Sequence, residues 1–383
     1  MPVDMRLRPL FAGGAQTFRS VISPLGSGQT IRLHLSNRFG RNPITFSAVR
    51  IARQTSGAAI DGRSNVRVRF GGTETVTIPA GADVVSDPLR FAFRSFEHLS
   101  VSLATPDAPA VPTHHLQARQ HSYATDPDAG DHTADVDETS FTQAVILRPF
   151  VTGLDTLASE STSVVVTLGD SLTDGVQGTP YLIEDPETLD LDQRYPDFLR
   201  RRLEAADLPV FVSNAGIGGN QVVHDSVLTP SEAALHRVEP DVLDQAGVTD
   251  VIFWEGINDI GISGIDAAEL TDGYAQLIGK LHAQGLHVVQ MTLTPSGTAT
   301  LKSYSSPEAS AVRRAVNDWI RTESSADAII DLDAIVQDPA NPDRIDPAYD
   351  GGDGLHFNSA GYQRIAEAID LTSLGARRFT ARD

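Results

Sequence analysis

The chain has 383 residues and a formal net charge of −20, with 50 acidic residues against 30 lysines and arginines. This balance argues against a nucleic-acid partner, which needs a basic face, and against electrostatic attraction to anionic membranes. No apolar run approaches the roughly 20 residues that a membrane span needs. Because the chain contains no cysteine, disulfides, thiol catalysis and thiolate metal sites are excluded.

The length exceeds that of a typical single domain and predicts two domains. The first residues, 1–6, lead into no long apolar core with a cleavage site, so no signal peptide is expected. The sequence as written is therefore expected to be cytoplasmic, or secreted if a leader has been removed. The oligomeric state is not predicted.

Residues 1–152 are expected to form an all-β domain. Ile31, Leu33 and Leu35 alternate with polar residues, a period-two pattern typical of a half-buried strand. The pattern recurs over three further segments, residues 66–70, 76–78 and 99–103. Short strands with no helical pattern between them predict a β-sandwich of the jelly-roll kind.

Residues 160–383 change to a helix-and-strand pattern. Apolar runs predict strands at 164–168, 210–213, 251–254, 287–293 and 328–332. Between or after them, apolar residues recur at helical spacing, which predicts three helices with one apolar face each. These faces are Leu270, Tyr274, Leu277, Ile278 and Leu281; Val312, Val316, Trp319 and Ile320; and Tyr362, Ile365, Ala366 and Ile369, with Asn358 or Ser359 as the cap of the last helix. Alternating strands and helices predict a parallel sheet in a three-layer α/β/α domain of flavodoxin-like architecture.

Four short motifs in the second domain carry the chemistry. Three of them follow predicted strands: Gly-Asp-Ser-Leu-Thr at 169–173, Asn-Ala-Gly-Ile-Gly-Gly-Asn at 214–220 and Gly-Ile-Asn-Asp at 256–259. The fourth, Asp-Gly-Leu-His at 353–356, precedes the last helix. Ligands bind outside the carboxyl ends of strands in open α/β sheets, so Ser171 stands where a nucleophile belongs. Serine needs a neighbouring base, for which His356 is the candidate, with Asp353 to fix its tautomer.

The serine motif differs from the nucleophile elbow of α/β-hydrolases, because Thr173 stands where that motif requires glycine. The four motifs in this order resemble the SGNH hydrolases, the GDSL esterase and lipase superfamily, over roughly residues 160–372. The resemblance implies a serine carboxylic-ester hydrolase with Ser171, Asp353 and His356 as its triad. It also implies an oxyanion hole made by the backbone N–H groups of Ser171 and Gly219 and by the side-chain amide of Asn258. No cofactor or metal is expected.

The segment at residues 29–40 resembles the β-sandwich region that precedes the hydrolase domain in some actinobacterial GDSL proteins and xylanolytic esterases. This likeness favours short acyl groups, particularly acetyl on a carbohydrate, as the substrate. Carbohydrate binding, shaping of the acyl pocket and a purely structural role stay open for the first domain. The pocket itself is expected to be lined by the loops within residues 171–195, 219–232 and 294–306.

Three alternatives stand beside an esterase: an acyltransferase, a lipase with interfacial binding, and an inactive carbohydrate-binding protein. The intact set of motif residues argues against the inactive protein, and the acidic chain without an obvious amphipathic lid disfavours the lipase. Two other segments suggest metal ligands only weakly. The acidic run at 126–131 has its glycine one position too early for an EF-hand, and His114, His115 and His121 lack a supporting carboxylate.

Overall fold

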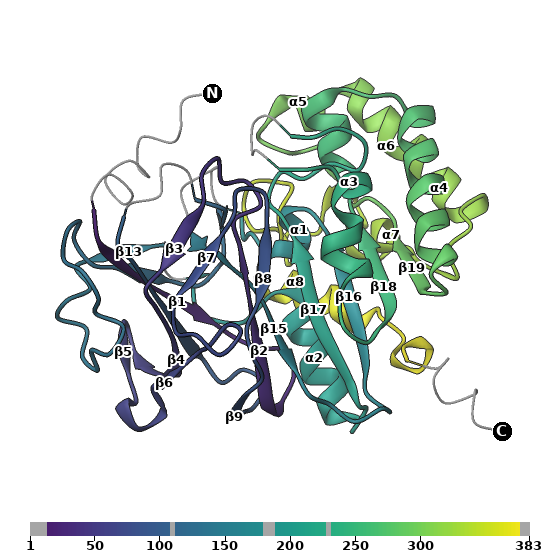
Figure 1. Cartoon of the computed structure of the whole chain (residues 1–383). Coiled ribbons are helices and arrows are strands. Elements are labelled where there is room, and N and C mark those ends of the chain that lie inside the picture. Colours follow the sequence, from purple (N-terminus) through teal and green to yellow (C-terminus); the bar gives the residue numbers. More distant parts are fainter. Residues whose placement is uncertain (1–13, 108–111, 179–187, 227–230, 376–383) are drawn as a thin grey trace. The chain divides into compact units, whose positions relative to one another are not determined.

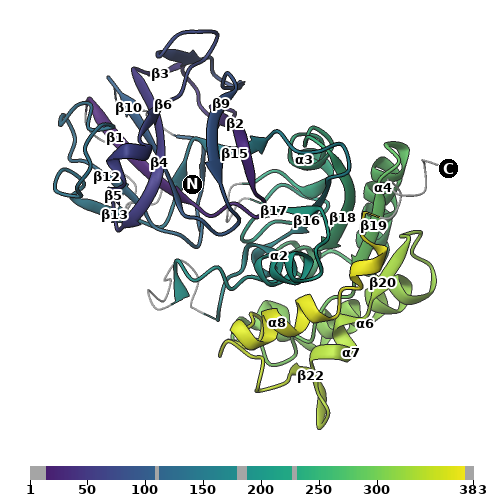
Figure 2. The ribbon, with the colours of Figure 1, turned by 90° about the horizontal axis from the view of Figure 1, so that it is seen from below.

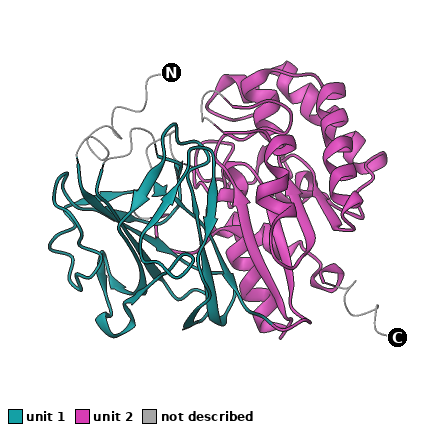
Figure 3. Ribbon diagram, viewed as in Figure 1, with its two compact units in different colours: residues 1–158 teal, residues 159–383 magenta. Residues whose placement is uncertain are grey.

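The chain folds as two units, traced in Figure 1 and seen from below in Figure 2. The computed structural model describes residues 14–107, 112–178, 188–226 and 231–375. Residues 1–6, for which the sequence predicts no signal peptide, lie outside the described residues. Unit 1 is Met1–Ala158 and unit 2 is Ser159–Asp383 (Figure 3). No helix in the described ranges is long and apolar enough to cross a membrane.

Unit 1 consists of antiparallel strands. They are, in chain order, β1 (Gln16–Ile22), β2 (Gly28–Ser36), β3 (Ile44–Phe46), β4 (Ala48–Ser56), β5 (Ala59–Ile60), β6 (Val66–Arg67), β7 (Val76–Ile78), β8 (Asp83–Val85), β9 (Leu89–Phe93), β10 (Leu99–Thr105), β11 (His114–His115), β12 (Ser122–Ala124), β13 (Gln143–Val145), β14 (Arg148–Pro149) and β15 (Val151–Thr156), with one 3₁₀ turn, η1 (Gly62–Ser64). The larger sheet runs β13-β12-β1-β10-β4-β5 with β6 beside β4, and the smaller runs β15-β2-β8 with β9 beside β2. Two-stranded pairs, β11-β14 and β3-β7, accompany them.

Side chains from both main sheets of unit 1 form one hydrophobic core. Ile31, Leu33 and Leu35 of β2 are buried in it, whereas the intervening Arg32 is exposed, which confirms the period-two prediction for this strand. Val101 and Leu103 of β10 enter the same core from the opposite sheet. The predicted all-β region is therefore an antiparallel sandwich closed by burial of apolar side chains.

Two features of unit 1 differ from the sequence predictions. Strand β1 was not predicted, because its polar residues break the alternation, yet all seven of its residues are buried between β10 and β12. The strand predicted at residues 66–70 is shorter, because β6 ends at Arg67 and Phe70 instead closes a tight turn with Thr73.

Unit 2 contains a parallel sheet with helices. Its strands are β16 (Ser163–Gly169), β17 (Val210–Gly216), β18 (Val248–Trp254), β19 (His287–Met291) and β20 (Ala328–Ile330), with a small hairpin of β21 (Gln337–Asp338) and β22 (Asn341–Ile345). Its helices are α1 (Ser171–Asp174), α2 (Tyr195–Ala205), α3 (Ala234–Val238), α4 (Ala267–Ala283), α5 (Lys302–Ser305), α6 (Pro307–Thr322), α7 (Leu332–Val336) and α8 (Ser359–Glu367), with short turns η3 (Glu239–Leu243), η4 (Asp259–Ser263) and η5 (Leu371–Ser373).

The sheet of unit 2 has the order β17-β16-β18-β19-β20, with every neighbouring pair parallel. The chain direction across the sheet reverses after β17. The helices form two groups, in which α2 packs against α8, and α4 packs against α3 and α6. This arrangement confirms the predicted three-layer α/β/α fold, and it brings the ends of β16, β17 and β18 to one edge of the sheet.

All three predicted helices are present, but two of their faces differ in detail. Val312 and Trp319 of α6 are half-buried, and Ile369 lies beyond the end of α8. The five apolar residues named for α4 are all fully buried, and Asn358, whose Oδ1 accepts the N–H of Gly361, caps α8. Strand β20 is shorter than the predicted segment 328–332, because Asp331 already caps α7 through the N–H of Ala334. Because α7 begins at Leu332, the strand cannot reach the predicted end at residue 332.

Candidate active site

Ser171 lies where β16, an interior strand of the sheet, ends and α1 begins. A Cβ placed on Gly169 would lie 2.3 Å from the carbonyl oxygen of Trp254 and 2.2 Å from Oγ1 of Thr173, so only glycine fits this close approach. Asp170 caps α1, since its Oδ1 accepts the N–H of Leu172 at 2.9 Å. The strand end, the glycine and the cap together fix the backbone of Ser171.

His356 hydrogen-bonds to Ser171 on one side and to Asp353 on the other. Ser171 Oγ lies 2.8 Å from His356 Nε2, although 185 positions separate the two residues in the chain. His356 Nδ1 lies 2.7 Å from Asp353 Oδ2. With Nδ1–H donating to the carboxylate, Nε2 is the free acceptor that faces the hydroxyl. The arrangement can therefore take a proton from Ser171.

The loop that carries Asp353 and His356 is held by its own hydrogen bonds. Asp350 Oδ1 accepts the N–H groups of Gly352 at 2.7 Å and Gly354 at 3.1 Å, and the N–H of Gly351 donates to the carbonyl of His356 at 2.8 Å. Gly354 has a φ of +73°, a left-handed conformation that favours glycine. These contacts bend the loop so that the two side chains meet.

Asp353 is held in its ionised form. Burial favours the neutral carboxyl, but hydrogen bonds from the His356 side chain and from the N–H groups of His356 and Leu355 outweigh it and lower the pKa of Asp353. The two N–H bonds to Oδ1 measure 2.8 Å and 2.9 Å. An ionised carboxylate here can orient the imidazole and stabilise its protonated form.

The other two candidate residues come from the next two strands of the sheet. Asn258 follows β18, and its Nδ2 donates to the carbonyl of Asn220 at 2.9 Å and to Oδ2 of Asp170 at 3.3 Å. Gly219, which follows β17, has a φ of +75°. Asn258 thus contacts Asp170, which precedes Ser171 in the chain, and Asn220, which follows Gly219. These contacts bring the three motifs together.

A buried arginine, which the sequence analysis did not single out, joins the same strand ends. Arg237 of α3 donates to the carbonyl of Gly169 at 3.0 Å, to the carbonyl of Ala215 at 2.8 Å and to Oδ1 of Asn220 at 2.7 Å. It is 2% exposed. No motif marks it, because a lone arginine in a helical pattern ordinarily lies on a solvated face.

Three carboxyl groups, those of Asp170, Glu255 and Asp259, are buried near these strand ends. Burial raises the pKa of Asp170 to about 7 and that of Asp259 to about 6, and it raises the pKa of Glu255 well above its ordinary range. Asp259 accepts the N–H groups of Val222 and Val223, and thereby holds the segment that follows Gly219. Glu255 lies 3.7 Å from Arg237. Burial therefore favours the neutral form of each of these carboxyl groups.

The described residues contain no group of three or more histidine, aspartate or glutamate side chains that could hold a metal ion. In the acidic run, Asp126 accepts the hydroxyl of Thr142 and Asp131 accepts the hydroxyl of Thr133. His114 hydrogen-bonds to the carbonyl of Pro112. Of the loops expected to line the pocket, residues 179–187 and 227–230 lie outside the described residues.

Comparisons with known proteins place this architecture in a family. The model of the GDSL-like lipase/acylhydrolase family matches residues 167–364, just over half of the chain. No curated protein matches the chain.

Several solved structures are similar to part of this chain. One is Est24, a carbohydrate acetylesterase from Sinorhizobium meliloti, with 16% identity and a TM-score of 0.41 over 57% of this chain and 100% of that one. Another is the acetyl xylan esterase AlAXEase, with 21% identity and a TM-score of 0.39 over 54% of this chain and 96% of that one. A third is the M. smegmatis aryl esterase, with 15% identity and a TM-score of 0.41 over 57% of this chain and 99% of that one. The family assignment rests on the matching model: the chain belongs to the GDSL-like lipase/acylhydrolase family of carboxylic ester hydrolases.

Proposed function

We propose that the protein is a serine esterase that works through an acyl-enzyme and removes short acyl groups, acetyl above all, from carbohydrate. The observation that carries the proposal is the chain of hydrogen bonds from Ser171 Oγ through His356 to Asp353, at 2.8 Å and 2.7 Å. A hydroxyl within reach of an imidazole that a carboxylate orients is the arrangement that acyl transfer requires.

The reaction proceeds in two halves. His356 Nε2 takes the proton as Ser171 Oγ bonds to the ester carbonyl carbon, and the carbonyl π electrons move to its oxygen. When the tetrahedral intermediate collapses, the bond to the alkoxy oxygen breaks, and His356 returns the proton to the leaving alcohol. Water then attacks the acyl-enzyme with the same base, which releases the acid and restores Ser171.

The oxyanion is held by the N–H groups of Ser171 and Gly219 and by the amide of Asn258. In the described part of the chain, neither N–H donates a hydrogen bond to another residue, which supports their availability to substrate. A neutral amide does not titrate, so Asn258 serves as a donor at any working pH. Such donors act mainly on the transition state and therefore raise kcat.

The substrate class rests on two further arguments. The net charge of −20 disfavours anionic lipid surfaces and polyanions as substrates, but it does not oppose a neutral sugar ester. The segment at residues 29–40 resembles the module that precedes the hydrolase domain in xylanolytic esterases. We accordingly propose that residues 1–152 form an accessory domain and that residues 160–383 form the catalytic domain.

The test is hydrolysis of p-nitrophenyl esters from acetyl to palmitoyl, together with acetylated xylan oligosaccharides, by the wild type and Ser171→Ala. We expect the fastest turnover with acetyl, a decline with chain length and loss of activity in Ser171→Ala. A serine-directed fluorophosphonate should add one mass increment to the wild type and none to the variant. The acyltransferase alternative is tested by adding an alcohol acceptor, because acyl transfer to it would yield a new ester.

Ser161→Ala is the matched control, because Ser161 precedes the start of β16 whereas Ser171 follows its end. It should retain full activity. Activity in folded Ser171→Ala would overturn the serine mechanism, and preference for palmitoyl over acetyl would overturn the proposed substrate class.

A further inference from the structure

Tyr304 contacts the side-chain amide of Asn258 but has no role in the proposed mechanism. It lies in α5, is 6% exposed, and its hydroxyl donates to Oδ1 of Asn258 at 2.8 Å. The Nδ2 of the same amide donates to the carbonyl of Asn220 and to Asp170. A backbone carbonyl can only accept, so the amide nitrogen must face it, and the tyrosine hydroxyl must be the donor to Oδ1.

The position of Tyr304 is itself restrained on two sides. Its ring lies against Gly261, where an added Cβ would come within 2.3 Å of the ring carbons. Its carbonyl accepts the hydroxyl of Ser296 at 3.1 Å. The ring packing and the backbone bond together hold the hydroxyl at one end of the Asn258 amide.

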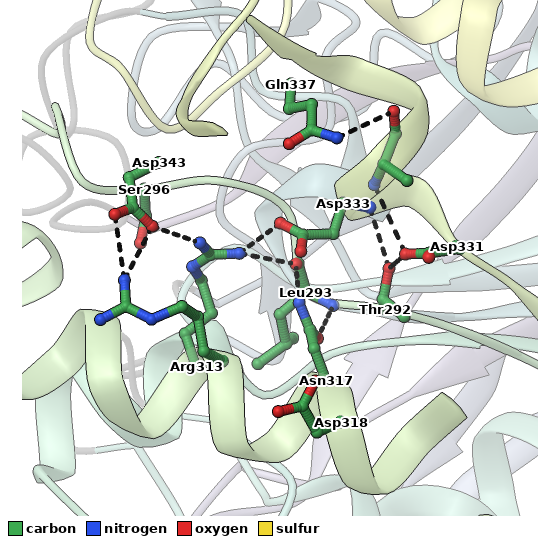
Figure 4. A network of polar contacts seen from close by, with 12 residues as sticks. Thr292, Leu293, Ser296, Arg313, Asn317, Asp318, Asp331, Asp333, Gln337 and Asp343 are labelled. Carbon is green, nitrogen blue, oxygen red and sulfur yellow. Dashed lines mark hydrogen bonds and ion pairs between the residues drawn. The ribbon is translucent and has the colours of Figure 1, made fainter. Parts of the chain in front are cut away.

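The loop that leads to Tyr304 is anchored by charged residues. The N–H of Gly297 donates to the carbonyl of Asp343 at 2.7 Å, and the carboxylate of Asp343 accepts from Arg313 at 3.0 Å and from Arg314. Figure 4 shows Asp343 close to Ser296 with Arg313 beside it. Arg313 is 1% exposed and also contacts Asp333. The loop therefore rests on a polar network in which Arg313 is buried and Asp343 and Arg314 are partly exposed.

We propose that Tyr304 is the positioning residue that orients and polarises the Asn258 amide for the oxyanion. This inference rests on the proposed function. The bond from Asn258 to Asp170 is long, at 3.3 Å, and is the one that a substrate oxyanion can replace. During that exchange the hydrogen bonds of the Asn258 amide to the Tyr304 hydroxyl and to the carbonyl of Asn220 remain in place. Donation to Oδ1 also withdraws electron density from the amide and strengthens its N–H as a donor.

The test is Tyr304→Phe, which keeps the ring against Gly261 and removes only the hydroxyl. Deletion of an oxyanion donor itself costs roughly a hundred- to a thousand-fold in kcat, and we expect loss of its orienting group to cost about tenfold. KM should stay within about twofold, because the contact acts on the transition state. The inhibition constant of phenylboronic acid, which forms an anionic tetrahedral adduct with serine, should rise by the same factor as kcat falls.

A double-mutant cycle separates positioning from general damage. In an Asn258→Ala background, Tyr304→Phe should cause no further loss of kcat, because the amide that it orients is gone. Ser296→Ala, which loosens the backbone of Tyr304, should give a smaller loss that disappears in the same background, and it replaces Tyr304→Phe if that variant does not fold. Tyr362→Phe is the matched control, since its hydroxyl is buried and donates to the carbonyl of Val176 instead. It should leave kcat unchanged.

A wild-type kcat in folded Tyr304→Phe, or an equal loss with and without Asn258, would overturn the inference. So would an unchanged affinity for phenylboronic acid in Tyr304→Phe. If Ser171→Ala is inactive and Asn258→Ala is impaired while Tyr304→Phe is not impaired, only the role of Tyr304 falls. Activity in Ser171→Ala would remove the proposed function itself.

Discussion

Each unit contains a histidine whose Nδ1 hydrogen-bonds to an aspartate three positions away. In unit 1, His132 lies 2.8 Å from Asp135, and in unit 2, His356 lies 2.7 Å from Asp353. The difference is in the other ring nitrogen. Nε2 of His132 faces the carbonyl of Ala129 at 3.1 Å, whereas Nε2 of His356 faces the hydroxyl of Ser171 at 2.8 Å.

That difference decides what each imidazole can do. A carbonyl only accepts, so His132 bonds to both partners when it is protonated, and the hydrogen bond to Asp135 raises the pKa of His132. A hydroxyl can donate, so neutral His356 satisfies both of its partners and keeps a lone pair for the serine proton. The same pair of residue types therefore closes a loop in one unit and forms a candidate general base in the other.

The largest expected effect follows from this pair. His356→Ala should lower kcat/KM by about 10⁴-fold or more, because the serine loses its base. His132→Ala should leave kcat/KM within about twofold. The measurement is p-nitrophenyl acetate hydrolysis per folded molecule, with folding checked by circular dichroism. Comparable losses in both variants would contradict the distinction.

The two units also each bury an arginine, and these differ in what they hold. Arg19 of β1 donates to Ser102, to the carbonyl of Ala58 and to the carbonyl of Asp135, and burial lowers the pKa of Arg19 to about 10. Arg237 instead joins the strand ends from which Ser171 and Gly219 follow. One guanidinium orders loops of the sandwich, and the other aligns the candidate site.

A second prediction compares the two arginines. Arg237→Lys keeps the charge but loses the planar fork that reaches several carbonyls, so kcat should fall about a hundredfold through misplacement of the strand ends. Arg19→Lys should lower the melting temperature while kcat per folded molecule stays at the wild-type value. Thermal melts and active-site titration with a fluorophosphonate separate the two effects. An unchanged kcat in Arg237→Lys would show that the strand ends do not need this clamp.

Much of this fold could be predicted from the sequence, because apolar periodicity is local. The alternation in β2 and the helical face of α4 each specify one element without knowledge of its neighbours. Strand β1 could not be predicted, since the partners that permit burial of Arg19 come from residues 58–141, far along the chain. Tertiary contacts there override the local pattern.

The residues of the candidate site also fall into those that a local sequence pattern signals and those that depend on distant contacts. The glycine-rich turns after β16, β17 and β18 signal Ser171, Gly219 and Asn258, whose roles remain predictions. Arg237, Glu255 and Tyr304 have no signal of their own, because each acts through partners that only the folded chain brings near. Glu255 even opposes the general rule that glutamate stays exposed, and it is 2% exposed. A buried charge is visible only once the packing around it is known.

The smallest effect expected concerns pH and compares two aspartates. Burial raises the pKa of Asp170 to about 7, so the folded chain binds a proton that the unfolded chain has released above pH ~4. Its contribution to the free energy of unfolding therefore declines as pH rises from about 4 to 7. In Asp170→Asn the free energy of unfolding should fall by about 1–3 kcal/mol less than in the wild type between about pH 4 and 7. Urea unfolding at several pH values measures this difference.

Asp135 in unit 1 should behave in the opposite sense. Burial opposes ionisation there, but hydrogen bonds from Ser140 and His132 outweigh it and lower the pKa of Asp135. Its contribution is present above the unfolded pKa and is lost as pH falls through the lower folded value, so Asp135→Asn should reduce stability near neutral pH and not in acid. Asp135 is partly exposed, which keeps the change small. If both variants altered the pH dependence in the same direction, the contrast between a carboxyl that retains its proton beside Ser171 and one that releases it in a loop would be wrong.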